Sequence, residues 1–220
     1  MKSINDFSIK LREGATHYGI SLDNKTIDCF KTYTDIVSSW NLRMSLISKR
    51  DVNRFVEYHI LDSLKLASRL NMSTFRSVLD FGSGAGLPGI PLALAFPHLS
   101  VTLVDSRLKK CLFLEEVLKI VPVINAMVIR SRIESLPEKF YGFFDMVITR
   151  ATVSLSQFFL QCARFVSQNG TLVAIKGDNV ANELEDLQNI DDSRFFHIFS
   201  TVPASVENVR KGTIIFIRRQ

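Results

Sequence analysis

From residue 77 onward, short apolar runs alternate with stretches of helical character, and this alternation limits the possible folds more than any other feature of the chain. Apolar runs of about four to eight residues are typical of strands that are buried on both faces of a parallel sheet. The helical stretches between them then act as right-handed crossovers. The runs are Val78–Phe81, Val101–Asp105, Ala126–Ile129, Met146–Ile148 and Thr171–Ile175. The pattern predicts an α/β protein with a Rossmann-like parallel sheet.

The last part of the chain departs from this alternation. A helical stretch near residues 179–189 is followed by the runs Phe195–Val202 and Thr213–Ile217, and no helical stretch separates the two runs. Consecutive strands without a crossover predict an antiparallel hairpin. Five alternating strands closed by such a hairpin is the arrangement of class I methyltransferases, so we expect their seven-stranded sheet.

Residues 1–72 show a different hydrophobic periodicity, because their apolar side chains recur at helical spacing. One helix is predicted around Ile27–Val37, and a second one over Phe55–Leu66 with Asp51 as its N-cap. We therefore expect an N-terminal helical extension over residues 1–72 and a cofactor-binding domain over residues 73–220.

A glycine-rich turn follows the first predicted strand, in the sequence Asp80-Phe81-Gly82-Ser83-Gly84-Ala85-Gly86. Glycine allows a positive φ and lets a ligand approach the backbone closely. In open α/β sheets, ligands bind outside the carboxyl ends of the strands, where this turn begins. Gly82, Gly84 and Gly86 are therefore predicted to contact a cofactor. Asp80 is predicted to meet the ammonium group of that cofactor or to order the turn.

Two cofactor classes fit this turn. The segment Gly84–Gly89 satisfies the Gly-x-Gly-x-x-Gly fingerprint of dinucleotide-binding proteins, which would indicate an NAD-linked oxidoreductase. The position of Gly82 directly after the strand and the hairpin at the end of the chain favour S-adenosylmethionine and a methyltransferase. A glycine turn that binds no ligand is the third reading, and all three stay open at this point.

Two further segments are expected at the same edge of the sheet. Asp105 ends the second predicted strand, where a carboxylate accepts hydrogen bonds from ribose hydroxyls in nucleotide-binding Rossmann folds. Asp105 also suits the cap of the next helix, and one residue can do both. Ser131–Ser135 follows the third strand, and we expect adenine there, packed on Ile133. Both segments indicate a cofactor that contains adenosine, without separating S-adenosylmethionine from NAD.

The residues that several methyl-transfer reactions need are missing. The fourth predicted strand ends in Met146–Arg150, without the Asn-Pro-Pro-Tyr type of motif found in enzymes that methylate exocyclic amines of bases. Neither Cys111 nor Cys162 follows a proline, the usual setting of the nucleophile in cytosine C5 methylation. Guanine N7 is a suitable acceptor, because its lone pair is free at neutral pH. Catalysis then consists mainly of positioning and of tolerating the charge that develops on the purine.

The composition limits the partners only weakly. The 27 basic and 22 acidic residues give a net charge of +5, which is compatible with a polyanionic partner but does not require one. Cys29, Cys111 and Cys162 are too far apart in the sequence for a zinc motif and too few for a disulfide framework, so we expect no metal. The N-terminus lacks the apolar core of a signal peptide, and no uncharged run is long enough to span a bilayer. We expect a cytoplasmic protein that does not bind membranes.

A set of short motifs extends along nearly the whole chain. They are Trp40-Asn41, His59-Ile60-Leu61-Asp62-Ser63, Gly82–Gly89 with Pro91, Asp105-Ser106 with Lys109-Lys110 and Phe113-Leu114, Thr149-Arg150-Ala151, and Lys176-Gly177. Together they resemble the family of ribosomal RNA small subunit methyltransferase G, also called glucose-inhibited division protein B. Two positions depart from the family pattern, since Ser45 replaces the usual asparagine and Ile47 the usual threonine.

This resemblance implies an activity, a cofactor and a site. Members of the family use S-adenosylmethionine to methylate N7 of one guanine in bacterial 16S rRNA, so 16S rRNA or the small ribosomal subunit is the expected partner. The implied cofactor contacts are Gly82, Leu87, Ile133, Glu134 and Arg150. The expected RNA contacts are Lys109, Lys110 and Lys176. Arg150 is also expected to position the substrate without any general base, and its replacement to reduce methyl transfer far more than stability.

One helical face carries His59, Asp62 and Ser63, which we expect to form a buried polar network or a wall of the cofactor pocket. A catalytic triad is a weaker reading, because triads are defined by geometry that one helical turn does not provide. Three alternatives to the main interpretation remain: an NAD-linked oxidoreductase, a methyltransferase that acts on another RNA or on a small molecule, and a cofactor-binding protein without catalysis.

Overall fold

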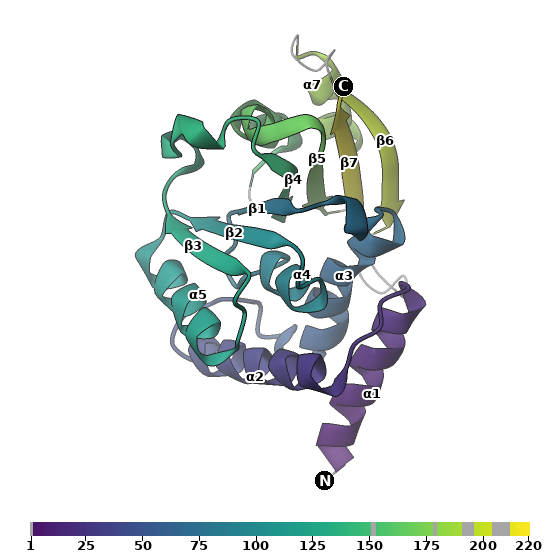
Figure 1. Ribbon diagram of the computed structural model, residues 1–220, viewed down its shortest axis with the longest axis vertical. Helices are drawn as coiled ribbons and strands as arrows, with labels where there is room; N and C mark the ends of the chain where they lie inside the picture. The colour runs from purple at the N-terminus through teal and green to yellow at the C-terminus, as the bar shows by residue number, and fades with distance from the viewer. Residues whose placement is uncertain (1, 151–152, 178–179, 191–195, 204–211) are drawn as a thin grey trace.

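A seven-stranded sheet forms the centre of the protein (Figure 1). The computed structural model describes residues 2–150, 153–177, 180–190, 196–203 and 212–220. The strands are β1 (Ser77–Phe81), β2 (Ser100–Asp105), β3 (Ala126–Arg130), β4 (Phe144–Arg150), β5 (Val166–Lys176), β6 (Phe196–Pro203) and β7 (Thr213–Arg219). Their order is β3-β2-β1-β4-β5-β7-β6; β1 to β5 are parallel, and β7 is antiparallel to both β5 and β6. The predicted fold class and its closing hairpin are confirmed.

The strand order reverses between β1 and β4. From β1 the chain crosses over to β2 on one side, whereas β4 pairs with the other side of β1. In open parallel sheets a crevice forms at the carboxyl ends of the strands where the order reverses, and ligands bind there. The glycine turn that follows β1 lies at this crevice.

Helices cover both faces of the sheet (Figure 1). They are α1 (Lys2–His17), α2 (Asn24–Asn41), α3 (Asp62–Leu64), α4 (Gly89–Ala95) and α5 (Leu108–Ile120) on one face, and α6 (Leu155–Cys162) and α7 (Ala181–Gln188) on the other. Successive strand residues point to opposite faces. In β1, Val78 accordingly belongs to the core under the first group and Leu79 to the core under the second.

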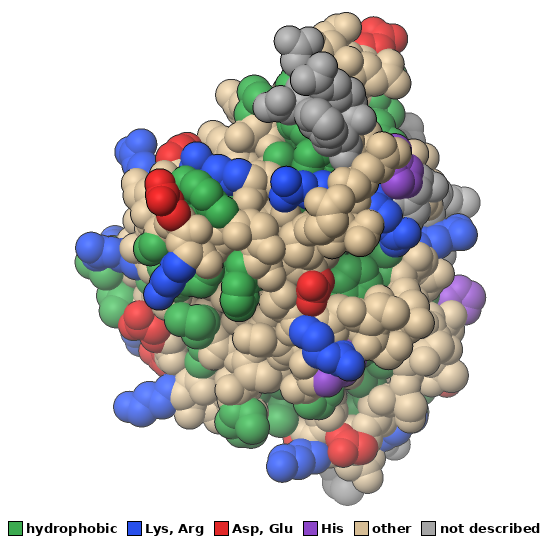
Figure 2. Space-filling view, turned by 45° about the horizontal axis from the view of Figure 1, so that its top comes forward, with side chains coloured by type: hydrophobic (Ala, Val, Ile, Leu, Met, Phe, Trp, Pro, Cys, Tyr) green, Lys and Arg blue, Asp and Glu red, His purple; other side chains and the backbone are tan. Residues whose placement is uncertain are grey.

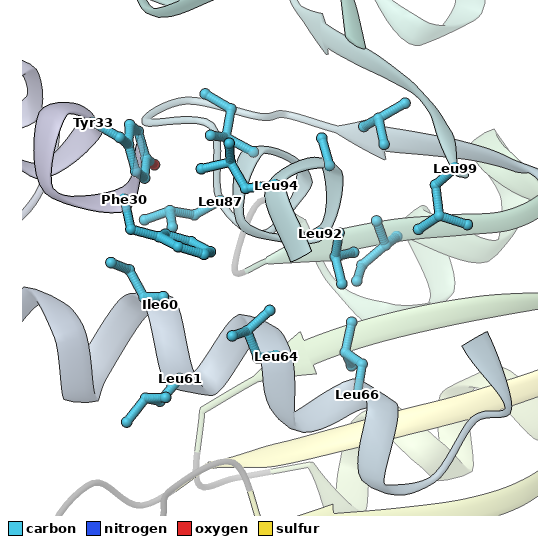
Figure 3. Close-up of a cluster of buried hydrophobic side chains, with 14 of the residues drawn as sticks. Phe30, Tyr33, Ile60, Leu61, Leu64, Leu66, Leu87, Leu92, Leu94 and Leu99 are labelled. Carbon is cyan, nitrogen blue, oxygen red and sulfur yellow. The ribbon is translucent and has the colours of Figure 1, made fainter. Parts of the chain in front are cut away.

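The N-terminal helices pack directly on the helix that follows the glycine turn. In Figure 3, Phe30 of α2 and Leu64 of α3 lie in the same cluster as Leu87 and as Leu92 of α4. The Tyr33 hydroxyl of α2 donates a hydrogen bond of 2.6 Å to the carbonyl of Ala85, within the turn itself. Burial, with the nearby Asp80 carboxyl, raises the pKa of Tyr33 well above 10.0, so its hydroxyl keeps the proton that it donates. One core therefore joins the helical extension to the cofactor cradle.

The chain between α2 and β1 is less regular than predicted. It winds through η1 (Val52–Arg54), the π-helical η2 (Val56–Leu61), α3, η3 (Lys65–Ser68) and η4 (Met72–Thr74), and the domain boundary predicted at residue 72 falls in η4. The prediction that Asp51 caps a helix is wrong, because its backbone is already helical and its side chain caps no N–H group. The Asp51 carboxylate instead lies 3.4 Å from Nε2 of His59.

Candidate cofactor-binding cleft

A cleft of about 550 Å³ opens at the carboxyl end of β1. Pockets of roughly 300–1,000 Å³ are typical for small ligands. The predicted site residues that line the cleft are Gly82, Gly84, Asp105, Lys110, Ile133, Glu134 and Arg150. Phe81, Ser106, Arg107, Ser131 and Arg132 also line the cleft, and they lie in or beside the segments that the sequence indicated. The sequence did not indicate Leu46, Val104, Val153 and Gln161, which line it as well. Asp80, Gly86, Leu87, Lys109 and Lys176 are not among the lining residues.

The glycine turn presents open backbone to this cleft. Gly82, Gly84 and Gly86 have φ values of 71°, 55° and 83°, a region that favours glycine. The N–H groups of Gly82 and Ser83 donate to the carbonyl of Val104, which fastens the turn to β2. A Cβ added at Gly84 would meet only the Gly82 carbonyl oxygen, at 3.6 Å. The protein therefore leaves free space at Gly84, and a ligand can approach the backbone there.

Gly86 has a different reason to be glycine. A Cβ at this position would lie 2.3 Å from Cδ1 of Ile90, inside the packed interface with α4. Leu87 is also buried in that interface, so its side chain supports the turn from behind (Figure 3). The predicted cofactor contacts of Gly86 and Leu87 remain predictions, whereas their packing roles are visible.

Asp80 lies beneath the turn rather than at the cleft. Its side chain is fully buried, and Oδ2 accepts a hydrogen bond of 3.0 Å from the N–H of Gly89, at the start of α4. The Ser83 hydroxyl donates to the Asp80 carbonyl at 2.9 Å. Of the two roles predicted for Asp80, the structure displays the one in which it orders the turn. Burial raises the pKa of the Asp80 carboxyl from 3.8 to about 7.

This raised pKa predicts a specific pH dependence of stability. The folded protein holds the Asp80 proton up to about pH 7, whereas the unfolded chain releases it near pH 3.8. Between these pH values the folded state binds more protons, so the free energy of unfolding falls as the pH rises. The Asp80→Asn variant keeps an oxygen acceptor but has no charge to bury. We expect its stability relative to the parent protein to increase from pH 4 to pH 7 by roughly 4 kcal/mol at most.

Urea denaturation at a series of pH values measures this difference directly. Subtracting the two curves removes the contribution of every other titrating group. A stability difference that stays constant between pH 4 and pH 7 would contradict the burial of an Asp80 proton.

Asp105 joins the turn to the start of α5. Its Oδ2 accepts a hydrogen bond of 3.1 Å from the N–H of Gly84, and its Oδ1 accepts one of 2.9 Å from the N–H of Arg107. The residue also lines the cleft and is partly exposed. Asp105 therefore orders the entry to α5 and still presents its carboxylate to a ligand, as the sequence allowed.

Arg150 ends β4 and reaches across to the helical extension. Its Nη2 donates a hydrogen bond of 2.9 Å to the carbonyl of Tyr58 and lies 3.6 Å from Oδ2 of Asp62. The side chains of Arg150 and Asp62 are only 12% and 4% exposed. Arg150 thus lines the cleft and at the same time makes a buried ion pair. Replacing Arg150 is therefore expected to lower the stability of the fold as well as methyl transfer, whereas the sequence suggested an effect mainly on methyl transfer.

The other residues of that helical face form a buried polar network. The Ser63 hydroxyl donates to the carbonyl of His59 at 2.6 Å, one turn earlier in the same helical segment. His59, Asp62 and Ser63 are all buried and do not line the cleft. Of the two predicted roles, network or pocket wall, the structure displays the network.

The three lysines that were predicted to bind RNA lie in three different settings. Lys109 is exposed on α5. Lys110 donates a hydrogen bond of 3.0 Å to the carbonyl of Ser45, and burial lowers its pKa. Lys176 is mostly buried, with its amine 2.6 Å from the carbonyl of Val153 and 2.9 Å from the Glu183 carboxylate. A phosphate could reach Lys176 only after this ion pair broke.

The segment after α2 forms one wall of the cleft. Asn41 Oδ1 accepts hydrogen bonds from the N–H groups of Leu46, at 2.7 Å, and Ile47, at 3.0 Å. These bonds and the Lys110 contact hold Leu46 at the cleft. All of them use backbone groups of residues 45–47, so the departures at Ser45 and Ile47 leave this arrangement intact.

Within the described ranges, no three His, Cys, Asp or Glu side chains are grouped as a metal would require. None of the described helices is both long and apolar enough to cross a membrane. The three cysteines are free, and neither Cys111 nor Cys162 lines the cleft.

Comparison with known proteins gives a consistent result. A family model described as rRNA small subunit methyltransferase G matches residues 26–208. A relative of that name from Chlorobaculum tepidum is 31% identical over 207 residues, which cover 94% of this chain and 92% of the relative. One from Acetivibrio thermocellus is 31% identical over 192 residues, covering 84% and 77%.

Solved structures share the fold at much lower identity. A SAM-dependent methyltransferase from Aquifex aeolicus is 16% identical, with a TM-score of 0.53 over 66% of this chain and 82% of that one. The antibiotic-resistance methyltransferase Kmr is 18% identical, with a TM-score of 0.51 over 66% of this chain and 87% of that one. The sheet and its flanking helices are thus those of class I methyltransferases.

Proposed function

Because the chain belongs to the rRNA small subunit methyltransferase G family, we propose that it methylates N7 of a guanine in bacterial 16S rRNA, with S-adenosylmethionine as methyl donor. The observation that carries the proposal is the cleft at the strand-order reversal, where the glycine turn, Asp105 and Ile133 converge. The family and the antiparallel β6–β7 pair both argue against the NAD-linked oxidoreductase.

The cleft residues fit this cofactor. Gly84 leaves its backbone open, the partly exposed carboxylate of Asp105 suits ribose hydroxyls, and the buried side chain of Ile133 offers an apolar surface to adenine. When bound, S-adenosylmethionine supplies a sulfonium methyl group as the electrophile. The chain itself contributes the shape of the cleft and the orientation of what it binds.

The acceptor is inferred from the side chains that line the cleft. The lining carboxylates, Asp105 and Glu134, lie in the segments that we assign to ribose and adenine, away from any acceptor base. The lining cations are the arginines and Lys110, and the lining set contains no cysteine. An acceptor that needs neither a general base nor a covalent nucleophile suits such a cleft, and guanine N7 is one.

The rim of the cleft suits a nucleic acid backbone. Exposed Arg107 and Arg132 line the cleft together with Lys110, and these three cations outnumber the two lining carboxylates, Asp105 and Glu134. On the face shown in Figure 2, basic side chains are dispersed among neutral and acidic ones. Phosphate contacts fix the register of a nucleic acid, and they make its affinity fall steeply with salt. We assign the rim to the phosphates of 16S rRNA, free or in the small ribosomal subunit, and place the protein in the cytoplasm with its substrate.

Methyl transfer into rRNA tests the proposal. The purified protein is incubated with labelled S-adenosylmethionine and either 16S rRNA or small ribosomal subunits. N7-methylguanosine carries a fixed positive charge and becomes sensitive to aniline after borohydride reduction. We expect one new cut in 16S rRNA that depends on both the protein and the methyl donor, and no cut with the Gly84→Val variant.

Two results would contradict the proposal in different ways. Label in 16S rRNA without an aniline-sensitive site would mean that another atom is methylated. Label in a small molecule, with none in either RNA substrate, would mean that only the cofactor assignment is right.

A further inference from the structure

Gln161 brings a buried amide to the cleft from the far side of the sheet. Gln161 lies on α6 and lines the cleft. The start of α6 is capped by Ser154, whose hydroxyl oxygen accepts a hydrogen bond from the N–H of Gln157. Oε1 of Gln161 is shielded from solvent and has no hydrogen-bond partner among the described residues. A buried acceptor without a donor is destabilising, so this atom is suited to a donor supplied by a ligand.

Apolar side chains contribute to the cleft on the side of α6. Val104 and Ile133 line the cleft and are buried in the same core cluster that contains Phe158, one turn before Gln161 on α6. The Phe81 ring stacks on Phe158 with an interplanar angle of 5°. α6 also packs beside η5 (Ile133–Ser135), the segment assigned to adenine. Apolar side chains with polar groups beside them, among them Gln161 Oε1 and Glu134, match a purine base, which has apolar faces and a polar edge.

We propose that Gln161 Oε1 accepts a hydrogen bond from the exocyclic amine of adenine and thereby makes the cleft selective for the adenine base. This inference rests on the proposed cofactor. S-adenosylmethionine has three kinds of hydrogen-bond donor: an ammonium group, two ribose hydroxyls and the exocyclic amine. The shielded position of Gln161 Oε1 disfavours the charged ammonium, and the ribose is assigned to Asp105. The exocyclic amine is the donor that is left for Gln161.

The position of Gln161 is set by the fold rather than by the ligand. Phe158, Phe159 and Cys162 of α6 are fully buried against β5 and its neighbours, which fixes the rotation of the helix. The Arg164 guanidinium lies 3.5 Å from the carbonyl of Glu134 and ties the end of α6 to η5. The acceptor is therefore held in place before any ligand arrives, which favours selectivity.

Two ligands that differ only at the amine test the proposal. The probes are S-adenosylhomocysteine and its 6-deamino analogue, in which hydrogen replaces the exocyclic amine, and calorimetry measures both affinities. The parent protein should bind the amine-bearing probe about 10-fold more tightly, the value of one neutral hydrogen bond to a buried acceptor. In Gln161→Met, which keeps the length of the side chain but has no amide, the two affinities should become nearly equal.

Two further variants control the comparison. Gln161→Glu retains an acceptor oxygen and should retain the preference for the amine. Gln157→Leu alters an exposed glutamine one turn away on the same helix and should leave both affinities unchanged. If Gln161→Met perturbs the packing of α6, Gln161→Ala provides the same comparison with a smaller side chain.

The outcomes separate this inference from the proposed function. An undiminished preference for the amine in Gln161→Met or Gln161→Ala would overturn the role of Gln161 and leave the cofactor assignment standing. A parent protein that binds both probes equally would also overturn it. A parent protein that binds neither probe would refute the cofactor assignment itself.

Discussion

The Gly84→Val variant is expected to lose binding of S-adenosylmethionine, by at least about 100-fold, while it remains folded. The added side chain meets no packed neighbour, because a Cβ at Gly84 would contact only the Gly82 carbonyl oxygen, at 3.6 Å. It projects instead into the space that the cofactor needs. The positive φ of 55° adds a strain of about 1–2 kcal/mol, which a protein of this size tolerates.

Calorimetry gives the affinity of this variant, and circular dichroism with thermal melting gives its fold. Gly142→Val is the matched control, because Gly142 also has a positive φ, of 64°, with nothing within 4 Å of an added Cβ, and it does not line the cleft. It should incur similar strain and keep its affinity. Normal binding by Gly84→Val would show that the turn does not hold the cofactor.

Gly89→Ala should have the opposite outcome. A Cβ there would lie 2.3 Å from Cδ2 of Leu103 and 2.6 Å from Oδ2 of Asp80, in the support of the turn. The variant should therefore lose stability first and affinity only as a result. Comparing it with Gly84→Val distinguishes residues of the turn that contact the cofactor from residues that support the turn.

The Arg150→Ala variant is expected to lose both stability and methyl transfer. Removing the guanidinium leaves the Asp62 carboxylate buried without its ion-pair partner, and breaking a buried pair in this way costs about 3–5 kcal/mol. It also removes the hydrogen bond to the carbonyl of Tyr58, which holds the helical extension to the end of β4. Urea denaturation measures the loss of stability. The rate of methyl transfer, taken at a temperature where the variant is folded, measures the loss of activity.

A double variant identifies the cause of this loss. Asp62→Asn combined with Arg150→Ala removes the buried carboxylate charge as well as the guanidinium, so it should be more stable than Arg150→Ala alone. If the single variant were as stable as the parent protein, the ion pair would contribute nothing and Arg150 would act on the substrate alone.

Much of the fold was predictable because buried parallel strands read as short apolar runs. Four of the five predicted parallel strands agree with the structure to within about two residues at each end. β5 is the exception, since it begins at Val166 rather than near Thr171. Its first half contains the exposed Gln168 and Asn169, so it shows no continuous apolar run.

The site was predictable where the chemistry is local in the sequence. Gly82, Gly84, Asp105 and Ile133 follow directly from the ends of strands, and the sheet brings them together. The partners of Arg150 were not predictable, because Tyr58 is 92 residues away in the sequence. The burial of Lys176 and the arrival of Gln161 at the cleft depend in the same way on how distant segments pack.

The hydrogen bond from Tyr33 to Ala85 has a consequence for how the protein opens and closes. Movement of the turn away from α2 breaks this hydrogen bond and disturbs the packing of α2 on the turn and on α4. Local opening is then a cooperative event that includes both parts. A ligand present at 100 times its dissociation constant stabilises the closed state by about 2.7 kcal/mol. No residue of α2 lines the cleft. Hydrogen exchange in α2 should nevertheless slow as the cleft fills, so the exchange rates of this N-terminal helix report whether a ligand is bound.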